Sequence, residues 1–135
     1  MPFSLISDQL VEYDASLPGI TLPISLKLGK RVVGIAAKVD TGATDCIFSR
    51  SVARQLDITP KSDERIRFGT ATGGFWTFRH QVTLSILENE FDAAVYFAED
   101  EAFNRSVLGR HGFLDRTVIG LIDYEGRLYL DKYSI

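Results

Sequence analysis

Residues 39–44 read Val-Asp-Thr-Gly-Ala-Thr, and the tripeptide Asp40-Thr41-Gly42 occurs once in the chain. It follows an apolar run, so it is expected to be a turn at the end of a strand. A given tripeptide arises by chance in about 2% of chains of this length. The residues around the turn must therefore decide what it does.

Alternating apolar and polar residues predict two strands before this turn. In Ile20–Leu28 every even position is Ile or Leu, which is the pattern of a strand with one buried face. Pro23 cannot donate a hydrogen bond to a neighbouring strand, so an edge is expected there. Gly29-Lys30 is typical of a hairpin turn into a second strand, Arg31–Val39.

The second half of the chain alternates in the same way. The longest alternation covers Phe78–Ile86, and Glu88-Asn89-Glu90 is expected to turn it into Phe91–Phe97. The last strands are expected over Thr117–Asp123 and Arg127–Leu130. Many short strands separated by turns indicate an all-β domain, either a β-barrel or a sandwich.

Helix signals are few. Ser49 is a good N-cap for a short helix over Arg50–Leu56, which would place Val52 and Ala53 on one face. A second short helix is expected over Arg110–Arg116. The sequence therefore predicts one or two short helices in an otherwise β fold.

Composition and charge restrict the function. The chain has 135 residues, of which 45% are hydrophobic and 24% charged, so one domain with a sizeable core is expected. A net charge of −3 and a pI near 5.3 argue against nucleic acid or an anionic membrane as a partner. We expect no membrane-spanning helix and no signal peptide. Cys46 is the only cysteine, so no intrachain disulfide can form and a cytoplasmic location is expected.

Two further motifs follow the turn in order. The first is a glycine-rich stretch between two predicted strands, Arg67–Phe75, which reads Arg-Phe-Gly-Thr-Ala-Thr-Gly-Gly-Phe. The second is Ser106–Arg110, which reads Ser-Val-Leu-Gly-Arg and is followed by Gly112-Phe113-Leu114. Three motifs in a fixed order are far more specific than one tripeptide.

With these motifs the sequence resembles the retropepsins, the single-domain, dimeric aspartic proteases of retroviral type, from roughly Ile20 to Leu130. The resemblance implies an all-β, closed β-barrel of the acid-protease type over residues 20–135. Residues 1–19 would be an N-terminal extension or strand of uncertain role. The resemblance further implies an aspartic endopeptidase that forms a homodimer and cleaves a peptide or protein substrate. It implies no cofactor, and the two histidines and one cysteine of the chain make no metal-ligand cluster.

The resemblance also assigns residues to the site. Asp40 would be catalytic, and Thr41, Gly42, Ala43 and Thr44 would complete the active-site loop. A flap that closes over the substrate would contain Thr72, Gly73, Gly74 and Phe75. Asp45, Leu108, Gly109 and Arg110 would support the loop from behind.

One Asp40 per chain makes activity depend on a twofold dimer. Two facing carboxylates about 3 Å apart cannot both ionise easily and share one proton, which is the known pattern of aspartic proteases. The ionised carboxylate would take a proton from a bound water, and the protonated one would polarise the scissile carbonyl. The pair titrates as a unit, so an acidic optimum is expected.

The function and one ion pair stay open at this point. The chain could be a catalytically silent, retropepsin-like dimerisation or peptide-binding module, because fold does not settle function. Some retropepsins carry an acid directly after Asp-Thr-Gly-Ala that pairs with the later arginine. Here that position is Thr44, so such a pair would have to join Asp45 and Arg110. Cys46 is expected to be buried or to line a groove, because a nucleophilic cysteine needs an oriented histidine.

Overall fold

Strands make up most of the protein in the computed structural model, which describes residues 9–61, 65–71 and 73–133. Within these ranges the one α-helix is short, and two further helical turns are 3₁₀. The prediction of an all-β fold with one or two short helices is therefore confirmed. None of the helices in the described residues combines the length and apolarity that a membrane crossing requires.

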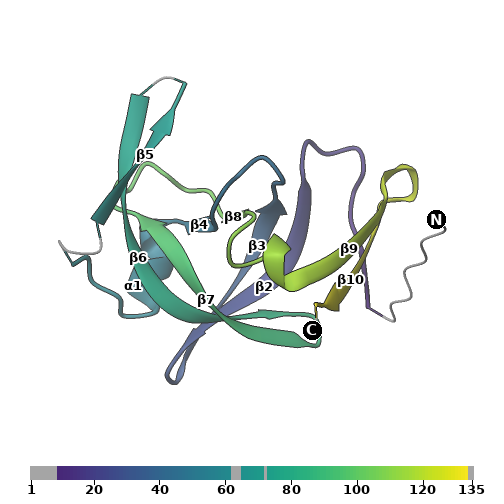
Figure 1. The fold of residues 1–135 in the computed structure, drawn as a ribbon, viewed down its shortest axis with the longest axis horizontal. Helices are drawn as coiled ribbons and strands as arrows, with labels where there is room; N and C mark the ends of the chain where they lie inside the picture. Colours follow the sequence, from purple (N-terminus) through teal and green to yellow (C-terminus); the bar gives the residue numbers. More distant parts are fainter. Residues whose placement is uncertain (1–8, 62–64, 72, 134–135) are drawn as a thin grey trace.

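One large sheet closes on itself (Figure 1). In the described residues its strand order is β2-β3-β8-β4-β7-β6-β5, and β2 also pairs with β6 over Ser25–Lys27. The β2–β6 pairing closes the sheet into a ring that encloses a core. The strands are β2 Ile20–Leu28, β3 Arg31–Val39, β4 Ile47–Phe48, β5 Arg65–Thr70, β6 Gly73–Ile86, β7 Asn89–Ala98 and β8 Val107–Leu108.

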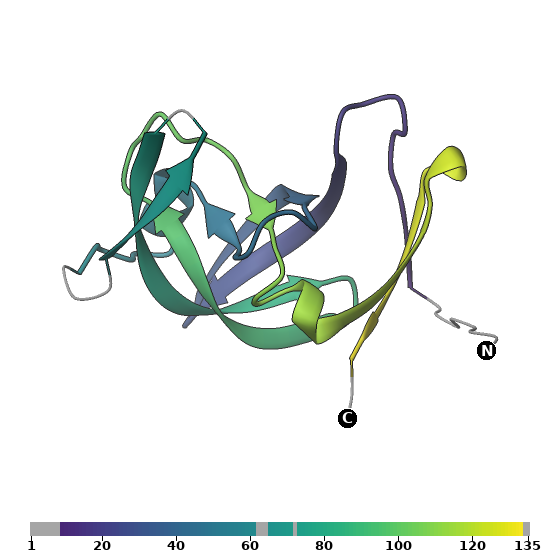
Figure 2. The same cartoon turned by 45° about the horizontal axis from the view of Figure 1, so that its top comes forward.

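A smaller sheet lies beside this ring (Figure 2). It pairs β1, Leu10–Glu12, with β10, Arg127–Lys132, and β10 with β9, Thr117–Ile122. Val11 and Leu128 are buried in this sheet. The strand nearest the start of the described chain is therefore held by the strand nearest its end.

The β2–β3 hairpin matches its prediction. Leu28 pairs with Arg31, which leaves Gly29-Lys30 as a two-residue turn. Gly29 has a φ of 60°, a left-handed conformation that glycine adopts without strain. Pro23 pairs only with Ala36 of β3, because β6 contacts β2 further along the strand. The open edge predicted at Pro23 is therefore confirmed.

The turn between β6 and β7 lies one residue earlier than predicted. Ile86 pairs with Asn89, so the turn is Leu87-Glu88 and the expected turn over residues 88–90 is wrong. Asn89 is buried, and its Nδ2 donates to Oε1 of Gln9 at 2.6 Å. This long-range hydrogen bond holds Asn89 inside the strand, and Leu87 takes the left-handed turn position with a φ of 54°.

Helix α1, Arg50–Gln55, is the helix predicted after Ser49. The Ser49 hydroxyl oxygen accepts a hydrogen bond from the Val52 N–H at 3.4 Å. This bond satisfies one of the N–H groups that a helix leaves unpaired at its start. Val52 and Ala53 are buried against the core, as their spacing predicted.

The second predicted helix is much shorter than expected. Instead of a helix over Arg110–Arg116, only Leu114–Arg116 forms a 3₁₀ turn. Gly112 has a φ of 98°, which is incompatible with a right-handed helix. Its N–H donates to Oδ1 of Asp115 at 3.0 Å, so the chain bends before the short turn begins.

The core fills the inside of the ring. Phe78 stacks on Phe97 with ring centroids 5.7 Å apart. The ring of Phe48 also packs against Phe97, with centroids 6.1 Å apart. All three phenylalanines and Leu108 are fully buried. Close packing around β3, β4 and β8 makes these strands a rigid base for the turns that leave them.

Candidate active site

Asp40 lies at one end of the ring, directly after β3. β3 runs parallel to β8 with Val39 opposite Leu108, and the Asp40 N–H donates to the Leu108 carbonyl at 2.9 Å. Asp40 is therefore the first residue beyond two adjacent strand ends. Functional side chains are often carried by loops that a rigid scaffold holds in this way.

The turn after β3 orients the Asp40 carboxylate. The Gly42 N–H donates to Oδ1 of Asp40 at 2.9 Å, and the Ala43 N–H donates to the Asp40 carbonyl at 3.2 Å. Asp40 is half-buried, whereas Thr41 and Gly42 are exposed. The carboxylate therefore has a fixed orientation and remains accessible.

The backbone after β8 is bonded to this turn. The Arg110 N–H donates to the Ala43 carbonyl at 2.9 Å, and the His111 N–H donates to the Thr44 carbonyl at 2.8 Å. Two main-chain hydrogen bonds thus join segments that lie far apart in the sequence. They connect the turn to the strand β8 scaffold through main-chain atoms.

Gly109 fills the narrowest point of this contact. It is buried, and a Cβ at this position would overlap the carbonyl of Asp45 and lie 2.8 Å from the carbonyl oxygen of Ala43. Leu108, the preceding residue, is fully buried. Both residues therefore lie behind the Asp40 turn, where the resemblance implies that they should lie.

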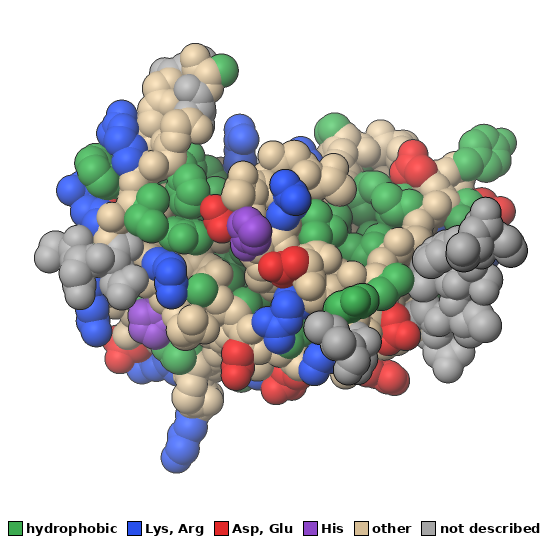
Figure 3. All heavy atoms as spheres, viewed as in Figure 1, with side chains coloured by type: hydrophobic (Ala, Val, Ile, Leu, Met, Phe, Trp, Pro, Cys, Tyr) green, Lys and Arg blue, Asp and Glu red, His purple; other side chains and the backbone are tan. Residues whose placement is uncertain are grey.

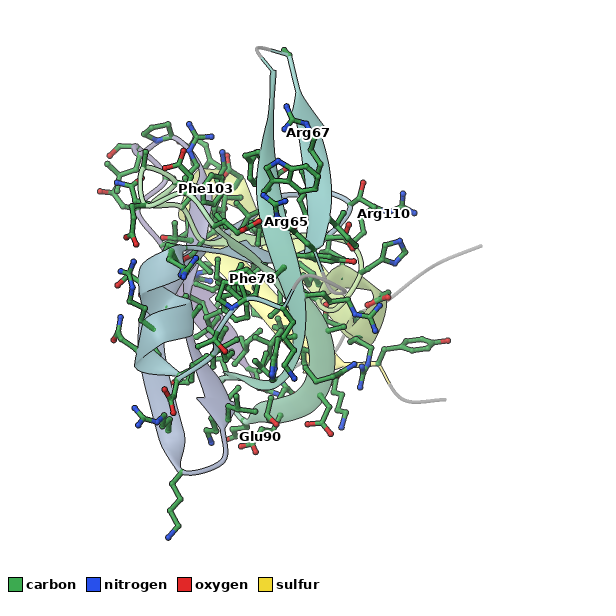
Figure 4. All side chains as sticks on the ribbon, turned by 90° about the vertical axis from the view of Figure 1, so that its left-hand side faces the viewer. Arg65, Arg67, Phe78, Glu90, Phe103 and Arg110 are labelled. Carbon is green, nitrogen blue, oxygen red and sulfur yellow. The ribbon has the colours of Figure 1, made fainter. Side chains whose placement is uncertain are left out.

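The Arg110 side chain takes no part in this support. It is exposed and extends away from the protein (Figure 4). Among the ion pairs of the described residues, none joins Arg110 to Asp45. Asp45 instead forms a parallel β-bridge with His111. The pair that the sequence left open is therefore absent, and Arg110 supports the turn through its backbone alone.

The hairpin of β5 and β6 projects from the ring near this turn (Figures 1 and 4). Its strands pair from Arg65 opposite Phe78 to Thr70 opposite Gly73. Gly73 has a φ of 137°, which L side chains rarely adopt. Thr72, a predicted flap residue, lies outside the described residues.

A cleft of about 430 Å³ is lined by both the turn and the hairpin. Six of the predicted site residues border it: Asp40, Gly42, Ala43, Thr44, Asp45 and Phe75. Leu108 and Gly109 lie behind the turn, and Thr41, Gly73, Gly74 and Arg110 do not border the cleft. The structure thus brings together the two motifs that the sequence placed about 30 residues apart.

Aromatic rings form one wall of the cleft. Phe75 stacks on Phe103 with ring centroids 4.9 Å apart, and Phe68 contacts Phe75 at 5.9 Å. Tyr96 packs against the edge of Phe68 at 5.0 Å. Figure 3 shows hydrophobic side chains gathered at the base of the projecting hairpin. Such a surface suits an apolar side chain of a bound peptide.

A larger hollow of about 540 Å³ lies elsewhere, against β2, β6 and β7. Its lining includes Lys27 and Glu90, which already form an ion pair at 3.0 Å, and the polar side chains of Gln81 and Thr83. It has no aromatic wall and does not include Asp40. Size alone therefore does not identify the active site, and the Asp40 cleft has the appropriate chemistry.

Phe103 and Arg105 border the cleft but were not assigned to it from the sequence. They lie on the loop between β7 and β8, which begins with the acidic residues 99–101. The sequence contained one indication that this loop packs against another part of the protein. Phe103 is a large apolar residue in a polar loop, and such a residue usually packs against another part of the protein.

No metal site is evident in the described part of the chain, because no three of its His, Cys, Asp and Glu residues gather closely enough to hold an ion. Cys46 is fully buried, and its Sγ lies 3.5 Å from the His111 carbonyl oxygen rather than near an imidazole ring. Burial raises the pKa of the Cys46 thiol to about 12. Cys46 is therefore a core residue, as expected.

The folded protein is expected to resist thiol labelling at neutral pH. A pKa of about 12, compared with 9.0 for a free thiol, leaves roughly 10³-fold less reactive thiolate at Cys46. The rate of reaction with a chromogenic disulfide reagent, measured with and without denaturant, checks this. Labelling of the folded protein at the rate of the unfolded chain would show that Cys46 is accessible.

Comparisons with known proteins agree with this geometry. The sequence profile of a family described as "Aspartyl protease" matches residues 23–111, which include Asp40 and the hairpin. None of the curated proteins compared with the chain matches it.

Two solved structures are similar in fold. A retropepsin-like aspartic protease from Rickettsia conorii is 16% identical and superposes with a TM-score of 0.65, over 94% of this chain and 100% of that one. EIAV protease, solved in complex with the inhibitor HBY-793, is 18% identical and has a TM-score of 0.58, over 74% of this chain and 88% of that one. The chain therefore belongs to the aspartyl protease family, as an aspartic-type endopeptidase with the retropepsin-like fold.

Proposed function

We propose that the protein is a homodimeric peptidase in which Asp40 of each chain contributes one carboxylate to a shared site. One observation carries this proposal. The chain has a single Asp-Thr-Gly turn, and its half-buried Asp40 carboxylate borders a cleft of peptide-binding character. The chemistry of aspartic proteases needs two facing carboxylates. A twofold axis that brings two such turns together supplies the second.

The mechanism follows from the shared proton. The ionised Asp40 takes a proton from a water molecule, and the resulting hydroxide attacks the scissile carbonyl. The protonated Asp40 of the partner donates to the carbonyl oxygen and stabilises the charge that develops there. The proton later passes to the departing amine, so no covalent intermediate and no cofactor are required.

The β5–β6 hairpin would act as the flap of this site. Phe75 borders the same cleft as Asp40 and contacts Phe103 on the opposite loop. Gly73 and Gly74 near the hairpin tip provide the backbone freedom that opening requires. Closure over a peptide would exclude water other than the attacking molecule.

The dimer is tested by mixing subunits. Wild-type protein is refolded together with an equal amount of Asp40→Asn protein, and hydrolysis of a peptide library is measured. If each site needs both Asp40 residues, activity per total protein falls to about one quarter, because only that fraction of random dimers is fully wild type. A fall to about one half would mean that each chain acts on its own, and a fall to about three quarters would mean that one Asp40 suffices in a dimer.

A control variant completes this experiment, and a second outcome would favour a different function. Mixing with Asp57→Asn protein, which alters an exposed carboxylate outside the cleft, is expected to leave activity unchanged. Peptide binding without hydrolysis in the wild type, retained after Asp40→Asn, would instead favour a catalytically silent binding module.

A further inference from the structure

The loop between β7 and β8 brings a cation to the cleft. Phe103 and Arg105 of this loop border the cleft together with Asp40 and Asp45. Figure 4 shows Phe103 on the loop beside the hairpin. Arg105 is the one cationic side chain among the described residues that border the cleft. The cleft therefore has an aromatic wall, two carboxylates and a single guanidinium.

The acidic residues nearest to Arg105 in sequence are bonded elsewhere. Glu99 pairs with Arg65 at 2.6 Å, and Glu101 pairs with Arg54. The Asp100 side chain accepts a hydrogen bond from the Ala102 N–H at 2.8 Å. The start of the loop thus holds its own carboxylates in place without using Arg105.

Arg105 itself has no bonded partner within residues 9–61, 65–71 and 73–133. Its side chain is exposed, and none of the ion pairs, hydrogen bonds or ring contacts of these residues includes it. Asp45 borders the same cleft but forms no ion pair with Arg105. An arginine presents a planar fork of donors that fits a carboxylate in two hydrogen bonds. The Arg105 guanidinium is therefore available to a ligand.

We propose that Arg105 selects peptides that carry an Asp or Glu side chain close to the cleaved bond. This inference rests on the proposed function, because it concerns the substrate of the same cleft. Asp40 and Asp45 repel a substrate carboxylate elsewhere in the cleft, so the acidic side chain is directed to Arg105. The Phe68, Phe75 and Phe103 wall receives an apolar neighbour of that acidic residue. Lysine and arginine at the same substrate position are excluded by like charge.

The test is a digest of a random peptide library, with the cleaved bonds identified by mass spectrometry. Wild-type protein is expected to enrich Asp and Glu by about five-fold near the cleaved bond, on either side of it because each chain of the dimer contributes one Arg105; five-fold is the upper range for an exposed ion pair. Arg105→Gln should remove the enrichment, and Arg105→Glu should replace it with enrichment of Lys and Arg. The preference is the ratio of acidic to other residues among the bonds cleaved in one digest. A variant that is slower on all peptides therefore keeps the same ratio.

Arg79→Glu is the matched control. Arg79 is exposed on β6 and does not border the cleft, so the same charge reversal there should leave the preference unchanged. An identical shift in Arg79→Glu and Arg105→Glu would mean a general charge effect and would overturn the inference. Absence of acidic enrichment in the wild type, with cleavage still dependent on Asp40, would overturn it while leaving the proposed function intact.

A binding measurement keeps the inference testable without turnover. The same library is passed over immobilised Asp40→Asn protein, and the retained peptides are sequenced. Acidic peptides should be enriched on Asp40→Asn protein and not on the Asp40→Asn/Arg105→Glu double variant. Equal retention by the two proteins would refute the role of Arg105 even if no peptide is ever cleaved.

Discussion

Asp40→Asn is expected to lower kcat for peptide hydrolysis by at least ~10³-fold. The substitution removes both the general base and the general acid of the proposed dimer, and each such role is typically worth about 10²–10⁴-fold. Asparagine has nearly the shape of aspartate, and its side-chain oxygen can still accept the hydrogen bond that Gly42 donates at 2.9 Å. The fold and the affinity for peptides should therefore change little. Steady-state kinetics on one cleaved peptide, together with thermal unfolding, checks both expectations.

Asp57→Asn is the matched control for this experiment. Asp57 is exposed after α1 and has a φ of 59°, a conformation that asparagine tolerates well. The same chemical change there should leave kcat within a factor of two or so, because surface substitutions of this kind have small effects. Residual hydrolysis near the wild-type rate in Asp40→Asn would rule out Asp40 as the catalytic group.

Strand β2 was predictable because it has one face in the core and one in solvent. The alternation in Ile20–Leu28 matches the buried residues Leu22, Ile24 and Leu26 of β2. A strand with this arrangement shows its burial directly in its sequence. The cap at Ser49 was equally local, because its hydrogen bond reaches only three residues along the chain.

Features that depend on distant partners were not predictable. Asn89, the residue that follows the Leu87-Glu88 turn, is buried and hydrogen-bonded to Gln9, which lies 80 residues away in sequence. Arg105 belongs to the cleft only because its loop folds back beside the hairpin. The loop has a mostly polar sequence, and such a sequence does not predict which part of the protein the loop will pack against.

The order of the motifs nevertheless predicted part of the candidate site. Asp40 and Gly109 belong to different motifs, yet backbone hydrogen bonds bring their segments together. No periodicity predicts such a contact, because it depends on the parallel pairing of β3 with β8. The resemblance to a known family supplied this contact, and the packing of Gly109 now gives its physical reason.

Gly109→Ala is expected to destabilise the protein by about 3 kcal/mol or more, at the upper end of overpacking costs. The added Cβ would overlap the Asp45 carbonyl and lie 2.8 Å from the Ala43 carbonyl oxygen. Both clashes are with backbone, so no side chain can rotate away to relieve them. The Asp40 turn must shift instead, and activity should fall together with stability. Thermal unfolding should show a lower Tm by on the order of 10 °C.

Gly34→Ala separates this steric effect from the general cost of replacing a glycine. Gly34 lies in β3, and a Cβ there would meet no atom within 4 Å, so the same substitution should change stability by less than ~1 kcal/mol. A Gly109→Ala protein as stable and as active as Gly34→Ala would show that the turn can move freely at no cost. The support that β8 gives to Asp40 would then be unnecessary. A large loss at Gly109 alone would instead show that the Asp40 turn depends on the close approach of these two backbones.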